Sequence, residues 1–209
     1  MKFESLIFDI DGTLWDSRAL IAEGYNIQLR KEGLHHLQTN EEVLLQLFGR
    51  TMSDIADNLF PEFAPEERYA LMDRCIASED AYLEQHPCDT IAYPDILPTM
   101  EELKKKHRLF IVSNAQCGYP ELCMEKLGLE QLIQGHLCYG DTGTPKGQTI
   151  LRLMPTHGIS SACYIGDTQG DATAAKVAGI PFVYCAYGFG NVDGFWKSID
   201  CFADLLKLF

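Results

Sequence analysis

Two carboxylates that follow a short apolar segment near the amino terminus are the first residues in this chain that could carry chemistry. The segment 6–8 (LIF) reads as a buried strand, and Asp9 and Asp11 come directly after it, before a turn at Gly12. Because side chains alternate along a strand, both carboxylates are expected on the same side, where their charges repel each other. A cation between the two groups would remove this repulsion.

A second set of polar residues is expected at the same edge of the sheet. The apolar segment 109–112 reads as a strand that leads into Ser113 and Asn114, and Lys146 starts a predicted helix further along the chain. Ligands of open α/β sheets bind outside the carboxyl ends of the strands, where these residues would lie. A hydroxyl, an amide, backbone N–H groups and one ammonium in this position could bind a phosphoryl group.

Two further carboxylates, Asp167 and Asp171, follow the strand predicted at 162–165, within the sequence GDTQGD. Mg²⁺ prefers hard oxygen ligands, usually one or two carboxylates with waters and a substrate phosphate oxygen. Asp9 and Asp167 could supply those carboxylates. Asp171, about one helical turn after Asp167, could join through water or hold the other ligands in place. The polar residues together predict a site for Mg²⁺ and phosphate.

Each of these patterns has an ordinary structural explanation when it stands alone. Asp11-Gly12 is typical of a turn, Ser113-Asn114 of a helix cap, and GDTQGD of a turn followed by a helix N-cap. Lys146 by itself carries almost no information. Their occurrence in this order, on successive predicted strand ends, favours one shared site.

The elements that must position these residues follow from the hydrophobic pattern. After residue 88, apolar strands alternate with helices; the strands are predicted at 109–112, 136–139, 162–165 and 181–185, and the helices at 94–107, 122–127, 148–157, 170–178 and 203–208. This alternation indicates parallel βαβ units and a doubly wound parallel (Rossmann-like) α/β sheet.

Residues 17–87 have a different pattern. They lack β-branched runs, and their apolar residues recur at the spacing of about four helices. The chain is therefore predicted to consist of an α/β core, residues 1–16 and 88–209, with an all-helical domain inserted after the first strand. Because the insertion leaves from the edge that carries Asp9 and Asp11, it is expected to cover the site.

Composition limits the kind of protein. The net charge of -13 over 209 residues argues against nucleic acid as a partner, which requires clustered Lys and Arg. No apolar run approaches the roughly 18 residues that span a bilayer, and the amino terminus does not resemble a secretory signal. The eight cysteines are scattered without a C-x-x-C pair, which favours buried thiols in a reducing compartment over a zinc site. A cytoplasmic protein, monomeric or homodimeric, is expected.

The polar motifs and their order resemble a known family. DIDGT (9–13), SN (113–114), the single downstream Lys146, and GDTQGD followed by AAKVAG are similar, in that order, to the four sequence motifs of the haloacid dehalogenase-like (HAD) superfamily. The helical insertion resembles the C1 cap of that superfamily. The sequence DIDGTLWDS looks most like the phosphoglycolate phosphatase and β-phosphoglucomutase group. The resemblance covers nearly the whole chain, although only the core motifs are specific.

The resemblance implies a catalytic role for three residues. Asp9 matches the nucleophile that forms an aspartyl-phosphate. Asp11 matches the general acid/base that protonates the leaving oxygen and then activates water, and its backbone carbonyl is expected to reach the metal. Lys146 matches the residue that balances charge on the nucleophile and the phosphate. In the family Pro often follows this lysine, whereas here Gly147 follows it.

The resemblance also implies binding roles. The residues expected to bind Mg²⁺ are Asp9, Asp11, Asp167 and Asp171. The residues expected to contact phosphate are Gly12, Thr13, Ser113, Asn114 and Lys146. Gly12 is also expected to be the point where the chain leaves the strand toward the cap.

The function implied is a Mg²⁺-dependent phosphatase that acts on a small phosphorylated metabolite, such as phosphoglycolate, a sugar phosphate or a nucleotide. A sugar phosphomutase has the same core motifs and is an alternative; a non-catalytic protein that binds a phosphorylated metabolite is a third. Arg50, in a predicted turn of the cap, could bind a carboxylate or second phosphate of the substrate, or could be a surface arginine. The aromatic segment 186–196 could line the site or pack beneath it.

Overall fold

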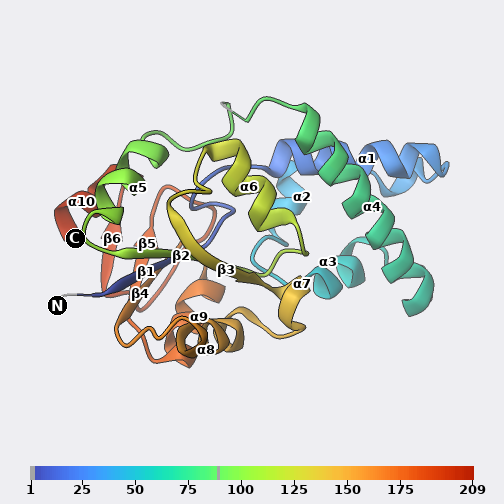
Figure 1. Ribbon diagram of the computed structural model, residues 1–209. Coiled ribbons are helices and arrows are strands. Elements are labelled where there is room, and N and C mark those ends of the chain that lie inside the picture. Colours follow the sequence, from blue (N-terminus) through green and yellow to red (C-terminus); the bar gives the residue numbers. More distant parts are fainter. Residues whose placement is uncertain (1–2, 89) are drawn as a thin grey trace. The chain divides into compact units, whose positions relative to one another are not determined.

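A computed structural model of the protein describes residues 3–88 and 90–209 (Figure 1). Residues 1, 2 and 89, which fall within the predicted core, lie outside the described residues. The strands are β1 (Ser5–Phe8), β2 (Arg108–Ser113), β3 (Ile133–Cys138), β4 (Ala162–Gly166), β5 (Phe182–Cys185) and β6 (Lys197–Ile199). The α-helices are α1 (Arg18–Lys31), α2 (Glu41–Leu45), α3 (Met52–Leu59), α4 (Pro65–Gln85), α5 (Ile96–Lys104), α6 (Tyr119–Leu127), α7 (Tyr139–Thr142), α8 (Lys146–Thr156), α9 (Gln169–Ala178) and α10 (Leu205–Leu208), with 3-10 segments η1 (His35–Leu37) and η2 (Phe202–Asp204).

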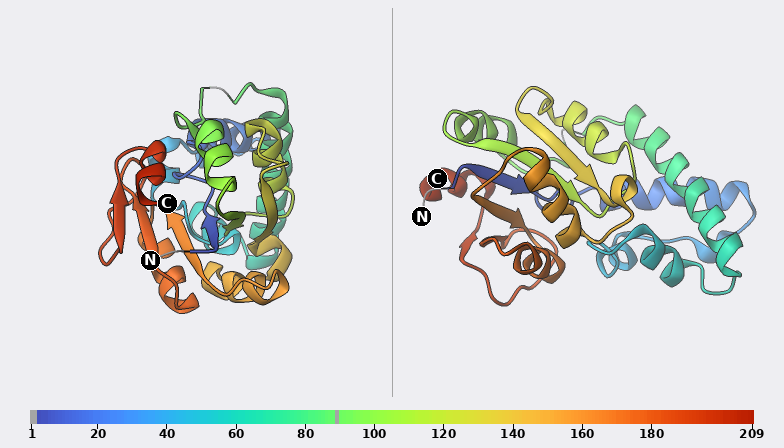
Figure 2. Two further views of the ribbon diagram at one scale, coloured as in Figure 1. Left: turned by 60° about the vertical axis from the view of Figure 1, so that its left-hand side comes forward. Right: turned by 60° about the horizontal axis from the view of Figure 1, so that its bottom comes forward.

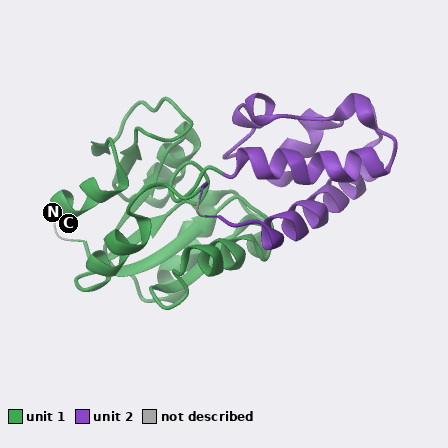
Figure 3. Cartoon of the chain, turned by 90° about the horizontal axis from the view of Figure 1, so that it is seen from above, with its two compact units in different colours: residues 1–16, 91–209 green, residues 17–90 purple. Residues whose placement is uncertain are grey.

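The chain divides into two compact units (Figure 3). The α/β unit comprises the residues up to Asp16 together with Ile91–Phe209, and the helical unit comprises Ser17–Thr90. The helical unit ends at Thr90, three residues beyond the predicted boundary at 87. Within its described residues, its regular elements are the helices α1 to α4 and η1. The role of this unit as a cap stays a prediction.

The strands of the α/β unit form one sheet. Across the described residues the sheet has six strands in the order β3-β2-β1-β4-β5-β6, and all neighbours pair in parallel. β1 lies in the interior, where Phe8 pairs with Ile111 of β2 and with Ile165 of β4. The strand order reverses next to β1, and in doubly wound sheets this reversal marks the ligand-binding edge. The predicted doubly wound α/β fold is confirmed.

Helices cover both faces of this sheet, as two views show (Figures 1 and 2). α8 and α9 pack on one face, in a core that includes Ile7, Phe110 and Ile150. α5 and α6 lie on the opposite face (Figure 1). Burial on both faces explains why β1 reads as a continuous apolar run rather than an alternating one.

A glycine allows α8 and α9 to pack closely. A Cβ atom on Gly147 would lie 2.8 Å from Cβ of Val177 and 3.2 Å from the carbonyl oxygen of Ala174. No residue with a Cβ atom, proline included, would fit there without a shift of α9. This contact gives a physical reason for the glycine that follows Lys146 where the family often has proline.

In the helical unit, α1 and α4 also approach closely through a glycine. A Cβ atom on Gly24 would lie 2.6 Å from the Cα atom of Glu79. Arg74 of α4 donates two hydrogen bonds to the carboxylate of Glu32, at 2.6 and 2.8 Å. A bidentate pair of this kind fixes relative orientation as well as distance.

Most predicted elements are present, and the differences are local. β6 and α7 are not predicted, because a three-residue strand and a four-residue helix leave no recognisable apolar pattern. The helix predicted at 203–208 is a 3-10 turn followed by the short α10. No helix among residues 3–88 and 90–209 is long and apolar enough to cross a membrane.

Candidate active site

The carboxyl ends of β1, β2 and β4 bring predicted site residues to one edge of the sheet. Asp9 follows β1, and its N–H donates a hydrogen bond to the carbonyl oxygen of Ile165 at 2.9 Å, which extends the pairing with β4. Ser113 is the last residue of β2, and Asp167 directly follows β4. The parallel register therefore gathers side chains from three distant parts of the chain.

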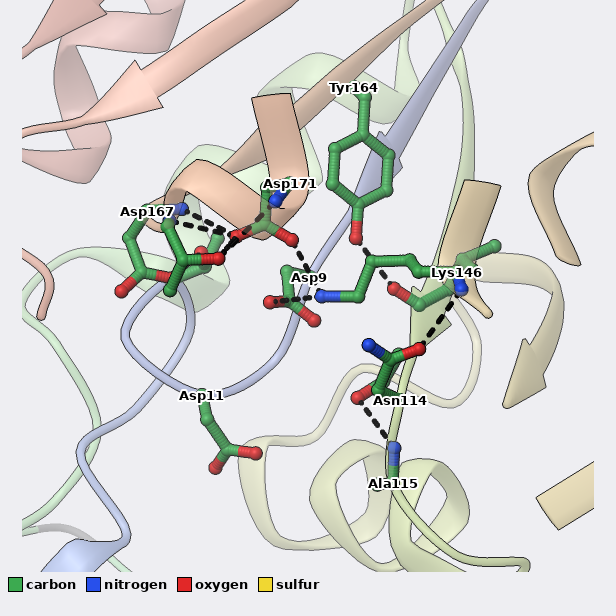
Figure 4. Close-up of polar contacts among 12 residues, drawn as sticks. Asp9, Asp11, Asn114, Ala115, Lys146, Tyr164, Asp167 and Asp171 are labelled. Carbon is green, nitrogen blue, oxygen red and sulfur yellow. Dashed lines mark hydrogen bonds and ion pairs between the residues drawn. The ribbon is translucent and has the colours of Figure 1, made fainter. Parts of the chain in front are cut away.

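Lys146 lies between two carboxylates at this edge (Figure 4). Its Nζ atom is 2.7 Å from Oδ2 of Asp9 and 2.6 Å from Oδ1 of Asp171. The three side chains are only 4%, 5% and 0% exposed. The aromatic ring of Tyr164 lies 5.9 Å from the same ammonium. The ammonium is thus held at a fixed point beside Asp9.

Burial and neighbouring charges shift the ionisation of these groups. Burial and the nearby Asp171 carboxylate raise the pKa of Asp9, against the opposing effect of Lys146. Burial would lower the pKa of Lys146, but the Asp171 and Asp9 carboxylates raise it above its ordinary value. Lys146 therefore keeps its positive charge. For Asp167, burial and then the charge of Asp171 raise the pKa.

Asp171 is held on both of its carboxylate oxygens. Oδ1 contacts Lys146, while Oδ2 accepts hydrogen bonds from the backbone N–H groups of Asp167 and Thr168 at 3.1 and 2.9 Å and from the Thr168 hydroxyl at 2.7 Å. Thr168 and Asp171 form the capping box that begins α9. Burial would raise the pKa of Asp171, but Lys146 and these donors lower it. Asp171 therefore positions Lys146 as a carboxylate.

The backbone of two glycines, Gly12 and Gly188, packs directly against Asp167. Its Oδ2 atom accepts a hydrogen bond from the N–H of Phe189 at 2.8 Å, and its Oδ1 atom accepts one from the Thr13 hydroxyl at 3.3 Å. A Cβ atom on Gly12 would lie 2.0 Å from Oδ2, and one on Gly188 would lie 2.3 Å from Cβ of Asp167. Gly12 also has a φ of 75°, a conformation that favours glycine.

Asp11 lies apart from this group. β1 ends at Phe8, and the chain turns over residues 10–15, where the carbonyl oxygen of Ile10 accepts hydrogen bonds from the three N–H groups of residues 13–15. Figure 4 shows the Asp11 carboxylate away from that of Asp9. The strand alternation that predicts both carboxylates on the same side does not extend to Asp11, because β1 has already ended at Phe8.

Two aromatic residues hold the Asp11 carboxylate. Its Oδ1 atom accepts hydrogen bonds from the Tyr119 hydroxyl at 2.7 Å and from the indole N–H of Trp15 at 3.0 Å. The two rings are in edge-to-face contact, with centroids 5.7 Å apart, and both are buried. The carboxylate thus has a defined orientation set by rigid side chains.

The residues after β2 are tied to the start of α8. Oδ1 of Asn114 accepts a hydrogen bond from the backbone N–H of Lys146 at 3.0 Å, and Oγ of Ser113 accepts one from the N–H of Ala115 at 3.2 Å. Asn114 thus helps to place the first residue of α8. Ser113, buried at the end of β2, lies at the predicted phosphate-binding edge.

The acidic residues provide a donor set that suits a hard cation. Among the described residues, Asp9, Asp167 and Asp171 each offer a carboxylate oxygen within 4.8 Å of the others, and all three are buried. The ammonium of Lys146 faces this group. Oxygen donors with excess negative charge fit Mg²⁺ and do not suit a metal that prefers sulfur or nitrogen. Asp11 is not a member of the group.

One predicted site residue, Arg50, belongs to the helical unit, and its role stays a prediction. Arg50 is exposed in the helical unit, in the turn between α2 and α3. Four residues with a defined role at the edge were not singled out from the sequence: Trp15, Tyr119, Thr168 and Phe189. Phe189 falls in the aromatic segment noted above, but it acts through its backbone N–H, which no sequence pattern reveals.

The fold and the carboxylate–lysine network define a doubly wound α/β protein with an acidic site at the strand ends. Residues 6–185 match the family model described as haloacid dehalogenase-like hydrolase. The chain belongs to this family.

Named relatives lie in the same family. A phosphoglycolate phosphatase of Caulobacter vibrioides is 25% identical over 88% of this chain and 80% of its own length. A phosphoglycolate phosphatase of Agrobacterium fabrum is 28% identical over 89% of this chain and 82% of its own length. A haloacid dehalogenase-like family hydrolase from Streptococcus pneumoniae matches the fold with a TM-score of 0.82 at 18% identity, over 99% of this chain and 98% of that one. The predicted class, a HAD-like hydrolase with phosphatase relatives, is confirmed.

Proposed function

We propose that the protein is a Mg²⁺-dependent phosphatase that hydrolyses a small phosphorylated metabolite through an aspartyl-phosphate on Asp9. The observation that carries this proposal is the buried contact of Lys146 with both Asp9 and Asp171 at the carboxyl edge of the sheet. Lys146 keeps a carboxylate oxygen of Asp9 fixed beside a positive charge. A nucleophile that attacks an anionic phosphate needs such compensation.

In this proposal Asp9 and Asp167 hold the metal through their carboxylates, and Asp11 does so through its backbone carbonyl. When bound, Mg²⁺ offsets the negative charge of the carboxylates and the substrate phosphate. Asp171, also expected at the metal, has both oxygens occupied by hydrogen-bond donors. We therefore propose that Asp171 positions Lys146 and that any link between Asp171 and the metal passes through a water molecule.

The first step is attack of a carboxylate oxygen of Asp9 on phosphorus. A bond forms between that oxygen and phosphorus, and the bond between phosphorus and the ester oxygen breaks. Asp11, in its protonated form, gives its proton to the departing oxygen, so that the alcohol leaves neutral. Tyr119 and Trp15 keep the Asp11 carboxylate oriented during this transfer.

The second step releases phosphate. Asp11, now a carboxylate, takes a proton from a water molecule, whose oxygen attacks phosphorus as the bond to the Asp9 oxygen breaks. Inorganic phosphate and the original Asp9 carboxylate result, and Asp11 is again protonated. The Ser113 hydroxyl, the Asn114 amide and the backbone at Gly12 and Thr13 are proposed to bind the phosphoryl oxygens with Lys146.

The relatives named phosphoglycolate phosphatase support a small phosphorylated hydroxy acid as the substrate. Such a substrate carries a carboxylate besides its phosphate, and we assign recognition of that carboxylate to Arg50. A charge-assisted hydrogen bond of this kind contributes about 1.5–3 kcal/mol. These relatives also favour transfer of the phosphoryl group to water over transfer to a sugar, the alternative of a phosphomutase.

A substrate panel tests the function. The wild-type protein is expected to release inorganic phosphate from phosphoglycolate and from p-nitrophenyl phosphate when Mg²⁺ is present, and Asp9→Asn is expected to release none. Conversion of a hexose phosphate to its isomer without phosphate release would support the phosphomutase instead. Binding of phosphoglycolate without turnover by the wild type would support a binding protein.

The proposed setting is the cytoplasm, with a free small metabolite as the partner of the site. Eight free cysteines across the described residues are consistent with a reducing compartment. The net charge of -13 continues to argue against nucleic acid. Whether the enzyme acts as a monomer or a homodimer follows from its mass in solution, measured by light scattering.

A further inference from the structure

Two thiols and a carboxylate meet at the edge of the α/β unit near the end of β3. Cys117 lies in the loop between β2 and α6, Cys138 is the last residue of β3, and Asp141 lies in α7. Sγ of Cys138 is 3.1 Å from Oδ2 of Asp141, and Sγ of Cys117 is 3.5 Å from Oδ1. All three ligand atoms lie within 4.8 Å of one another. We call these residues the thiol cluster.

We propose that the thiol cluster binds one thiophilic divalent cation, of the class of Zn²⁺, at a site separate from the acidic site. Two thiolates and one carboxylate are a donor set that zinc accepts and that Mg²⁺ does not. The acidic site, in contrast, offers only carboxylate oxygens. The two sites therefore differ in the kind of metal that each selects.

The ligand atoms lie near the separations that tetrahedral coordination requires, within 4.8 Å of one another. Zn–S bonds of about 2.3 Å and Zn–O bonds of about 2.1 Å place neighbouring ligand atoms roughly 3.5–3.8 Å apart in a tetrahedron. The two sulfur–oxygen distances, 3.1 Å to Oδ2 and 3.5 Å to Oδ1, involve different oxygens of Asp141, so the side chains must adjust for one oxygen to join both sulfurs at the metal. Cys117 and Asp141 are exposed, so solvent can supply the fourth ligand. On binding, each thiol releases its proton to water as its sulfur–metal bond forms.

Backbone contacts hold the cluster in place. Asp141 is oriented by a hydrogen bond from the N–H of Cys138 to its Oδ2 atom, at 2.8 Å. Gly140 lets Cys117 approach, because a Cβ atom there would lie 2.2 Å from the nitrogen and 2.8 Å from the sulfur of Cys117. The N–H of Gly140 also donates a hydrogen bond to the carbonyl oxygen of Ala115 at 3.1 Å. Preorganised ligands lower the cost of binding.

The spacing of the cysteines in the sequence argues against a zinc site. Strand pairing in the sheet nevertheless brings two of them together. β2 and β3 pair in parallel, with Ser113 opposite Cys138, so the loop that follows β2 reaches the end of β3. The two cysteines therefore meet although 20 residues separate them in the chain. A motif of closely spaced cysteines is not required when strand pairing brings distant ones together.

The chain contains its own control for the cluster. Cys201 and Asp204 have the same C-x-x-D spacing and form the same capping box as Cys138 and Asp141. Cys201 is exposed, and Asp204 is engaged in an ion pair with Lys207. Within the described part of the chain, no third Cys, His, Asp or Glu joins this pair to form a group of possible metal ligands. This pair is therefore expected not to bind the metal.

Co²⁺ titration of the reduced protein, with Mg²⁺ in excess to occupy the acidic site, tests the proposal. We expect one equivalent of Co²⁺ to produce the ultraviolet thiolate-to-cobalt charge-transfer absorption, and Zn²⁺ to displace it. Cys117→Ser and Cys138→Ala should each abolish the band, and Asp141→Asn should weaken Co²⁺ binding about ten-fold or more. Cys201→Ser should behave as the wild type.

Several results would overturn the proposal: no charge-transfer band in the wild type, an unchanged band in Cys117→Ser, or its loss in Cys201→Ser. A disulfide between Cys117 and Cys138 in protein kept under reductant would do so too. Because Cys117 is exposed, its serine variant remains informative even where the buried Cys138→Ala fails to fold. Asp9→Asn should keep the band, so failure here and failure of the proposed phosphatase activity are distinguishable.

Discussion

Gly12 and Asp167 lie so close together that a Cβ atom on Gly12 would be 2.0 Å from Oδ2 of Asp167. The turn after β1 therefore touches the carboxylate that follows β4, and no other residue type fits between them. Gly188 approaches Asp167 from another loop, with a Cβ position 2.3 Å from that of Asp167. The position of this carboxylate depends on two glycines, which have no side chain to displace it, as much as on hydrogen bonds.

Gly12→Ala is expected to inactivate the enzyme. The left-handed φ of 75° costs an alanine about 1–2 kcal/mol, and the new methyl group must displace Asp167. A displacement of about 1 Å in a catalytic group can lower the rate about 100-fold. Thermal unfolding and phosphatase assays measure the two effects.

Gly33→Ala is the matched control for that variant. Gly33 has the same φ of 75°, but nothing lies within 4 Å of a Cβ atom there. It should lose stability by the backbone cost alone and retain full kcat. Equal losses of activity in both variants would contradict the role assigned to the contact with Asp167.

Lys146→Met is expected to lower both stability and activity. Removal of the ammonium leaves Asp9 and Asp171 buried without compensation, which costs about 3–5 kcal/mol for a broken buried ion pair. Urea unfolding measures the change. The exposed Lys176→Met should be neutral, and wild-type stability of Lys146→Met would mean that the network does not exist in solution.

Asp167→Asn and Asp171→Asn should separate metal binding from positioning. Asp167→Asn is expected to weaken Mg²⁺ binding about ten-fold or more, because a ligand is lost. Asp171→Asn should leave Mg²⁺ affinity near that of the wild type but lower kcat, because Lys146 loses a partner. Calorimetry measures the affinity independently of activity, with the exposed Asp193→Asn as control. Equal loss of affinity in both variants would assign Asp171 to the metal.

Tyr119→Phe should lower kcat/KM only for substrates whose leaving group needs a proton, because kcat/KM reports the first step, in which Asp11 acts as the acid. The variant removes the hydroxyl that donates to Asp11 at 2.7 Å, and general acid catalysis contributes about 100-fold or more. For an alkyl phosphate kcat/KM should therefore fall about ten-fold or more, whereas kcat/KM for p-nitrophenyl phosphate, with a good leaving group, should be almost unchanged. The exposed Tyr69→Phe should change neither. Equal slowing of both substrates would indicate a structural role instead.

Arg50→Ala tests the proposed recognition of a carboxylate. We expect kcat/KM for phosphoglycolate to fall about ten-fold or more, with little change for p-nitrophenyl phosphate, which has no carboxylate. Arg30→Ala is the control, because Arg30 is another exposed arginine of the helical unit and pairs with Glu23. Unchanged kcat/KM ratios across a panel of phosphorylated metabolites would contradict the assignment.

Much of the fold could be predicted because buried parallel strands leave strong apolar runs. β1, β2 and β4 are such runs, and each ends in a polar group that the sequence also displays. The register of these strands then places Asp9, Ser113 and Asp167 at one edge without further information. β6 escaped prediction because it is short and polar.

The orientation of the site residues could not be predicted, because it depends on turns and on distant donors. Strand alternation predicts Asp9 and Asp11 on the same side, yet β1 ends at Phe8 and the following turn directs Asp11 toward Tyr119, 108 residues away. The N–H of Phe189 and the absent Cβ atoms of Gly12 and Gly188 act on Asp167 through backbone geometry alone. The thiol cluster likewise depends on strand pairing.

The proposed aspartyl-phosphate is the central claim, and borohydride trapping tests it most directly. Borohydride reduces an acyl phosphate to the alcohol, so quenching the enzyme during turnover and sequencing its peptides by mass spectrometry reveals the phosphorylated residue. We predict homoserine at position 9, formed only when both Mg²⁺ and a phosphorylated substrate are present. Turnover with an unreduced Asp9, or with reduction at another carboxylate, would contradict the account.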